Sequence, residues 1–199
     1  MALAILCWTP LFSVAKRTLP VLDAFALGTV RYALGIALFV LLLAAFEGRS
    51  ALRFGDRLGA AVLSGMIGIT AFNLFVWLGL GYTRPEHASI ILALQSPLTA
   101  LALWLVRGQR PAGFTLACVA IAITGVVLVI SKGDLANALA GGSLLGDALV
   151  FMGAISWVTY ALSAGRFPGW SPLRFTVMTC IPGAVGLAIA NAIALAIGV

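Results

Sequence analysis

Amide and aromatic side chains interrupt the long apolar runs of this sequence near their centres. Asn73 and Trp77 lie one helical turn apart in one run, and Gln95 lies near the middle of the next, two residues before Pro97. An amide without a partner in an apolar medium costs several kcal/mol, so Asn73 and Gln95 must each face protein or water. Two neighbouring runs therefore bring hydrogen-bonding groups to a similar depth.

Aromatic residues lie at comparable positions in two further runs. Trp8 is near the middle of the first run, and Trp157 and Tyr160 lie in the sixth. Aromatic faces stack on planar or cationic solutes, and amides hydrogen-bond polar head groups. The functional interpretation is a wet central cavity lined by these aromatics and amides. A structural interpretation stays open, in which the amides only bridge helices and the tryptophans only pack.

Two local features indicate how these groups are positioned. Met66, Thr70, Asn73 and Trp77 recur at helical spacing, which predicts a single stripe on one helix. Pro97 has no N–H to donate, so it frees a backbone carbonyl one turn earlier and predicts a kink beside the Gln95 amide.

Catalysis on the chain is disfavoured by the scarcity of reactive groups. The sequence holds one histidine, and Ser64 in VLSGM lacks the glycine two residues earlier that a nucleophile elbow carries. The cysteines, Cys7, Cys118 and Cys180, fall in separate runs without metal-ligand spacing, which favours apolar packing. We therefore expect no catalytic residue, no metal site and no cofactor.

The elements that must hold these side chains are membrane helices. The chain is 62% hydrophobic and only 9% charged, which is far from a water-soluble composition. A bilayer core needs about 20 mostly apolar residues per helix. The sequence therefore predicts an all-α integral membrane protein with seven transmembrane helices in the intervals 2–15, 18–46, 58–83, 88–106, 111–131, 148–165 and 175–199.

The distribution of Lys and Arg predicts the orientation. With a cytoplasmic N-terminus, seven basic residues fall in inner loops and four in outer loops, as the positive-inside rule requires. The net charge of +6 is then an orientation signal, and we expect no nucleic-acid partner. Glu86 and His87 follow the outer turn, where they have either a plain helix-start role or a gating or proton-linked role. Arg31, inside the second interval, is expected to snorkel outward or to pair with a carboxylate.

Two segments of the chain resemble each other. ILCWTPLFSVAKR, residues 5–17, and AISWVTYALSAGR, residues 154–166, share Trp, Ala and Arg at one fixed offset. An odd number of spans separates the first helix from the sixth, so two such copies would be inverted in the membrane. Inverted repeats with a site at the midplane are a transporter architecture.

The sequence also resembles a known family. YTRPEHASIILALQSPLTALALWLVRGQRP, running on to GVVLVISKG, is similar to the third-to-fifth-helix region of EamA-type members of the drug/metabolite transporter superfamily. WTPLFSVAKRTLPVLDAFALGTVRYALG, which contains Arg31, is similar to the first two helices of that family.

The resemblance implies ten helices in two inverted five-helix repeats that rock against each other, with a small metabolite exported across the inner membrane. Residues 1–131 would form the first repeat, 132–143 an outer loop and 144–199 the first two helices of the second repeat. The last three helices of the family lie outside this sequence, so the chain is a fragment, a truncated product, or one half completed by a second chain or homodimer partner. The alternative function is a non-transporting scaffold or inactive remnant. The positions that the resemblance places on the substrate path are Trp8, Asn73, Trp77, Gln95, Trp157 and Tyr160.

Overall fold

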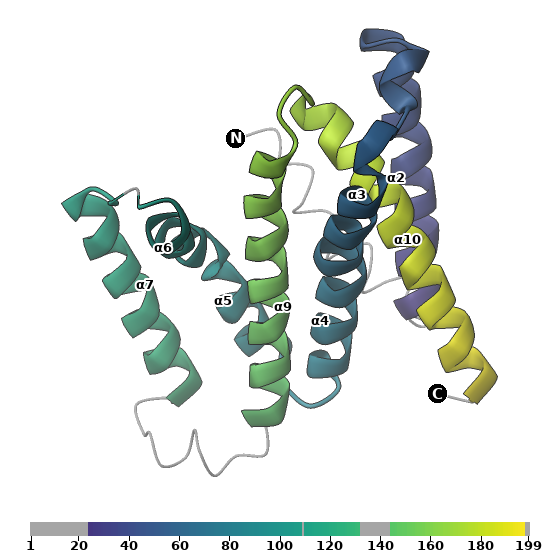
Figure 1. Cartoon of the computed structure of the whole chain (residues 1–199). Coiled ribbons are helices and arrows are strands. Elements are labelled where there is room, and N and C mark those ends of the chain that lie inside the picture. The colour runs from purple at the N-terminus through teal and green to yellow at the C-terminus, as the bar shows by residue number, and fades with distance from the viewer. Residues whose placement is uncertain (1–23, 109, 132–143, 198–199) are drawn as a thin grey trace.

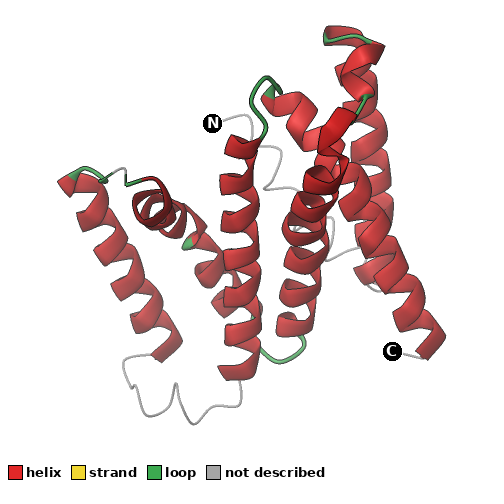
Figure 2. Cartoon of the chain, viewed as in Figure 1, coloured by secondary structure: helices red, strands yellow, loops and turns green. Residues whose placement is uncertain are grey.

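The described part of the protein is helical throughout. A computed structural model describes residues 24–108, 110–131 and 144–197, and these residues contain helices and loops without a strand (Figure 2). The elements are α2 (Ala24–Phe46), the short 3₁₀ turns η1 (Arg49–Leu52) and η2 (Gly55–Arg57), α3 (Leu58–Gly65), the π-helical segment η3 (Met66–Ala71), α4 (Phe72–Leu80), α5 (Pro85–Ala93), α6 (Gln95–Arg107), α7 (Gly113–Ser131), α9 (Leu144–Ser163), η4 (Ala164–Arg166) and α10 (Pro172–Ile197).

Four helical stretches are long and apolar enough to cross a membrane. They are Arg49–Leu80, His87–Val106, Leu144–Arg166 and Pro172–Ala196, and the shorter apolar helices Val30–Phe46 and Gly113–Gly125 accompany them. The predicted all-α membrane class is therefore confirmed for the described residues. The predicted first helix, with Trp8, and the predicted loop 132–143 lie outside them, so the seven-helix repeat arrangement stays a prediction.

Helix α9 forms the centre of the bundle. It packs on α4 and η3 on one side and on α5 and α6 on the other, while α10 packs on α2, α3 and η3 (Figure 1). The connections 47–57 and 164–171 lie at one end of the bundle, and the α4–α5 turn lies at the opposite end (Figure 1). Segments on both sides of residues 132–143 thus interlock instead of forming separate bodies.

Small residues allow the helix backbones to approach closely. A Cβ atom added to Gly79 on α4 would lie 2.8 Å from the Gly146 carbonyl oxygen on α9, and a Cβ added to Gly183 on α10 would lie 2.6 Å from the Gly65 carbonyl oxygen on α3. Helices in lipid associate mainly through such van der Waals packing, because burial of apolar surface gives little gain there. These two crossings are therefore expected to supply much of the helix–helix attraction.

The connections at one end of the bundle are tied together by polar contacts. Arg57 Nη1 donates to the Pro168 carbonyl oxygen at 3.1 Å, and Arg174 Nη2 donates to the Arg53 carbonyl oxygen at 2.8 Å. The Arg174 guanidinium also lies 4.8 Å from the centre of the Trp170 ring. The connections before α3 and before α10 are thereby held to one another.

The segment η3 departs from the predicted regular helix. Residues Met66–Ala71 are π-helical, and both α9 and α10 pack on this segment. Two members of the predicted four-residue stripe, Thr70 and Met66, contact each other on this segment, with Thr70 Oγ1 3.5 Å from Met66 Sδ. Thr70 Oγ1 donates to the Gly183 carbonyl oxygen on α10 at 2.7 Å, whereas Asn73 bonds to α2.

Replacing Thr70 by valine is expected to lower the free energy of unfolding by about 0.6–1.7 kcal/mol, the span from the mean to the maximum for interhelical hydrogen bonds in membranes. The variant keeps the side-chain shape and loses the hydroxyl donor to Gly183. Thr124→Val is the matched control, since the exposed Thr124 hydroxyl bonds only within its own helix, to the Ala120 carbonyl oxygen. Equal losses in detergent unfolding titrations of the two variants would contradict the importance of the interhelical bond.

Candidate functional site

The aromatic side chains predicted on α9 belong to a cluster between α4, α9 and α10 that extends toward the connection 164–171. The Trp157 ring centre lies 5.3 Å from that of Phe72 on α4 and 5.4 Å from that of Tyr160. Tyr160 in turn stacks on Phe175 of α10, with ring centres 5.1 Å apart. Three helices thus contribute to one aromatic wall, two of whose members the sequence had predicted.

The Tyr160 side chain is buried, and both its ring and its hydroxyl contact neighbouring helices. Only 7% of it is exposed, and its hydroxyl lies 3.0 Å from the Thr179 hydroxyl on α10. The Tyr160 ring packs directly on Gly68 of η3, where any Cβ atom would overlap it. The glycine in the π-helical segment is therefore what admits the aromatic ring between the helices.

Asn73 points to a partner that the sequence did not single out. Its Nδ2 atom donates to the Tyr32 hydroxyl on α2 at 2.9 Å and to the Ile69 carbonyl oxygen at 2.6 Å. A side-chain amide carries two donors, so both are used within the protein. Trp77, one turn further along α4, is half-buried. Asn73 thus links α4 to α2 immediately beside Phe72 and the aromatic wall.

The predicted kink near Gln95 is confirmed as a break between two helices. Helix α5 ends at Ala93, and α6 begins at Gln95, with Pro97 in its first turn. Proline is tolerated in a first turn because the N–H there has no partner inside the helix. The Gln95 side chain is half-buried, and its backbone carbonyl accepts the Thr99 hydroxyl at 2.7 Å.

The structure brings together only part of the predicted site. Trp157 and Tyr160 share one cluster with Phe72. Asn73 follows Phe72 in the sequence, but its amide bonds to Tyr32 and Ile69. Gln95 belongs to α6, and α9 lies between that helix and α4 (Figure 1). Trp8 lies outside the described residues.

The arginine predicted inside the second helix does not enter the site. Arg31 is exposed, and its guanidinium lies 5.2 Å from the centre of the neighbouring Tyr32 ring. The residue that reaches inward is Tyr32, the partner of Asn73. A phenol next to the arginine in an otherwise apolar run was a usable signal for this contact.

A second polar group lies at the end of the bundle opposite the basic connections. Asp147, in the first turn of α9, accepts a short hydrogen bond from the Thr83 hydroxyl, and its Oδ2 lies 3.4 Å from His87 Nδ1 on α5. His87 was predicted near this turn, but Asp147 was missed. A single carboxylate within an apolar run is costly in a membrane unless it is paired, and that was the available signal.

Metal-binding geometry is lacking in the part of the chain that the structure describes. No group of three or more His, Cys, Asp and Glu side chains there could hold a metal ion. Cys118 is exposed and Cys180 is buried, both as free thiols, and Cys7 lies outside the described residues.

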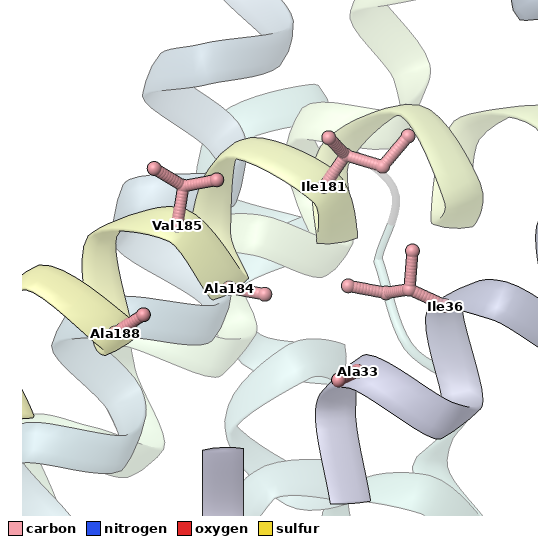
Figure 3. Close-up of a pocket in the computed structure, with 6 residues that line it drawn as sticks. All are labelled: Ala33, Ile36, Ile181, Ala184, Val185 and Ala188. Atoms are coloured by element: carbon pink, nitrogen blue, oxygen red, sulfur yellow. The ribbon is translucent and has the colours of Figure 1, made fainter. Parts of the chain in front are cut away.

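An apolar pocket between α2 and α10 does not coincide with the predicted site. It has a volume of about 250 Å³ and is lined by Ala33, Ile36, Ile181, Ala184, Val185 and Ala188 (Figure 3). Binding pockets for small molecules normally add a few polar groups to an apolar lining, and these six side chains supply none. The pocket therefore does not identify a substrate.

Comparison with known proteins connects this architecture to a family. Residues 1–131 match the EamA-like transporter family. The chain is 30% identical to the uncharacterized transporter YrdR of Bacillus subtilis over 98% of this chain and 62% of that protein. It is 27% identical to the uncharacterized transporter YyaM of the same organism, over 90% of this chain and 59% of the relative. An uncharacterized transporter of Archaeoglobus fulgidus is 31% identical over 83% of this chain and 56% of its own length.

The chain thus spans less than two thirds of the length of these curated relatives. No solved structure matches it. The family match covers most of the chain, and it agrees with the apolar helices long enough to cross a bilayer. The chain is a multi-pass membrane protein that belongs to the EamA-like transporter family.

Proposed function

We propose that this chain is part of a secondary transporter that exports a small solute by alternating access. The observation that carries the proposal is the aromatic wall between α4, α9 and α10, where Trp157 meets Phe72 and Tyr160 meets Phe175. Asn73, next to Phe72 in the sequence, adds an amide that bonds to Tyr32 of α2. Aromatic faces and amides together suit a planar or cationic solute with a polar head group. Trp8, Trp77 and Gln95 complete the proposed path.

Alternating access requires helices that can bend or shift. Residues 1–131 and 144–199 are proposed to form one whole repeat and part of a second, which rock against each other around the path. Three irregular positions supply flexibility: the break at Leu94, the π-helical segment η3 and Pro182 inside α10. The remaining helices would come from the rest of a longer protein or from a partner chain.

We propose that the protein lies in the inner membrane of the cell. In the proposed orientation its N-terminus is on the cytoplasmic side. The connections 47–57 and 164–171, which contain Arg49, Arg53, Arg57 and Arg166, lie at the same end of the bundle (Figure 1). Short basic loops stay on the cytoplasmic side during insertion. The Thr83, His87 and Asp147 group then lies near the outer surface.

Asn73→Leu and Gln95→Leu are expected to abolish transport in the full-length protein while leaving membrane insertion intact. Each change removes an amide from the proposed path and replaces it by an apolar side chain of similar size. The measurement is efflux of radiolabelled amino acids, nucleosides and quaternary amines from cells that produce the protein, with Thr124→Leu on the exposed part of α7 as the control.

Two outcomes of this assay would count against the proposal. Normal efflux in both amide variants would remove Asn73 and Gln95 from the path. Efflux of the whole panel at the level of cells without the protein would favour the alternative of a non-transporting scaffold. Insertion is checked in every variant by the amount of protein recovered from the membrane fraction.

A further inference from the structure

The contact between His87 and Asp147 joins two helices that are distant in sequence. His87 lies in the first turn of α5 and Asp147 in the first turn of α9, and both side chains are 10% exposed. Thr83, in the turn before α5, donates its hydroxyl to Asp147 Oδ1. A Cβ atom on Gly146 would lie 2.7 Å from the Thr83 nitrogen, so the turn is pressed against the start of α9.

The approach of His87 Nδ1 to Asp147 Oδ2 favours a proton on the imidazole. His87 Nδ1 is buried without a hydrogen-bond partner, and Asp147 Oδ2 faces it at 3.4 Å. An unprotonated imidazole nitrogen and a carboxylate oxygen are both acceptors, so they repel each other when no proton lies between them. A proton on Nδ1 removes this repulsion, and on an imidazolium it turns the contact into an ion pair at 3.4 Å.

A plainer role for Asp147 must be weighed against this. A carboxylate in the first turn of a helix is stabilised by the helix dipole, and the Thr83 hydroxyl gives it one partner. That role explains the position of Asp147 Oδ1. It does not explain why Asp147 Oδ2 faces the buried Nδ1 atom of His87. The two interpretations differ in whether the carboxylate controls the protonation of the imidazole.

We propose that His87 and Asp147 form a proton-binding site, at which protonation of His87 strengthens the attachment of α5 and the α4–α5 turn to α9. Histidine is the side chain that most commonly gains or loses a proton near neutral pH, so pH can control this attachment. Protonation from the outer side tightens the joint, and loss of the proton loosens it.

Few other ionisable groups face this site among the described side chains. On the elements packed against α5, α4 carries none, Cys118 on α7 is exposed, and Tyr160 lies 13 residues beyond Asp147, about 20 Å along α9. Arg84 and Tyr82, in the turn itself, are exposed. The side chains of Glu86 and Arg107 lie outside those that the structure describes. Asp147 is therefore the described charge that faces the imidazole directly.

The site has a consequence for transport that rests on the proposed function. Alternating access separates and rejoins the outer ends of helices on the two sides of residues 132–143, and α5 and α9 are such a pair. A proton bound between them favours the closed outer end, so a more acidic exterior favours the inward-open state.

The first test observes the imidazole directly and needs no substrate. Nitrogen-15-labelled histidine is incorporated into the purified protein in lipid nanodiscs, with an affinity tag that contains no histidine, and the His87 signals are assigned by their loss in His87→Gln. At the pH where His87 is half protonated, Asp147→Asn is expected to lower the ratio of protonated to neutral imidazole at least threefold. An asparagine retains an oxygen that accepts from Thr83, so the variant isolates the charge.

The matched control is Asp56→Asn, an exposed aspartate at the basic end of the bundle. It is expected to leave the His87 signals unchanged. An unchanged ratio in Asp147→Asn overturns the proposal. If that variant does not fold, Thr83→Val replaces it. The carboxylate then loses its hydroxyl partner, the ratio of protonated to neutral imidazole is expected to rise at least twofold, and no rise overturns the proposal.

The second test measures the attachment of the helices. Hydrogen exchange of residues 83–88 and 144–148, corrected for the intrinsic pH dependence, is expected to be at least threefold slower at pH 5.5 than at pH 7.5 in the wild type and equal at both in His87→Gln. Equal rates in the wild type overturn the proposal. Neither measurement depends on transport, so an absence of efflux would reject the proposed function without affecting this result.

Discussion

Gly65→Val is expected to prevent recovery of stably folded protein. A Cβ atom at this position would overlap the Thr179 carbonyl oxygen of α10 and lie 3.0 Å from the Gly183 nitrogen. Both are backbone atoms, which cannot rotate away as the end of a side chain can. Overpacking in a well-packed interior costs about 1–3 kcal/mol, and more where the backbone must move. Thermal unfolding in detergent, followed by size-exclusion chromatography, measures the loss.

The control for this variant lies on the same helix. A Cβ atom at Gly59 of α3 would have no neighbour within 4 Å, so Gly59→Val tests valine in α3 without the overlap. We expect this protein to be recovered in nearly wild-type amount and to unfold at nearly the wild-type temperature. A Gly65→Val protein as stable as Gly59→Val would show that α3 and α10 do not cross as described.

Tyr160→Ala is expected to destabilise the protein by about 3–5 kcal/mol, the usual cost of removing a large buried aromatic side chain. The change removes the stacking with Phe175 and the tilted ring contact with Trp157, and it leaves a cavity against Gly68. Tyr160→Phe keeps the ring and loses only the contact with the Thr179 hydroxyl, so it should cost about 1 kcal/mol. Unfolding titrations with a denaturing detergent compare the two.

Tyr82→Ala provides the comparison on the surface. Tyr82 is 59% exposed in the α4–α5 turn, so its removal is expected to change the free energy of unfolding by no more than about 0.5 kcal/mol. Similar losses for Tyr82→Ala and Tyr160→Ala would argue that the aromatic wall is not packed between the helices as described.

The apolar intervals of the sequence were sufficient to predict most helices. Charges and glycines bound the runs that became α7, α9 and α10, and proline in the fourth interval predicted the break that separates α5 from α6. Such features act locally, within one or two turns of the residue that causes them. The π-helical segment η3 was not predicted, because its sequence, MIGITA, is an ordinary apolar run. Both α9 and α10 pack on this segment with its wider turn. These contacts come from distant parts of the chain, so the local sequence does not reveal them.

The sequence was sufficient to predict several residues of the candidate site. It was not sufficient to predict which side chains they contact. A polar group within the membrane needs a hydrogen-bond partner, because leaving it without one costs free energy. Asn73, Trp157 and Tyr160 could therefore be chosen as candidate site residues from their side-chain types alone. Their partners Tyr32 and Thr179 depend on which helix faces which. Likewise, His87 was identifiable beside its turn, but its pairing with Asp147 required the placement of α9. The sequence thus indicates which groups need partners and leaves the pairing to the tertiary structure.

The interlocking of segments before and after residues 132–143 also constrains how the chain is made. The Thr70 hydroxyl bonds to a carbonyl 113 residues further along the chain. At about 5–20 residues per second, that acceptor leaves the ribosome roughly 6–23 seconds after Thr70 itself. During that delay the hydroxyl lacks its partner on α10, and the faces of α4 and η3 that later pack on α9 and α10 are exposed to lipid, water or the insertion machinery. The η3–α4 segment is therefore made well before α9 and α10 exist, so its packing against these two helices is a late step of assembly.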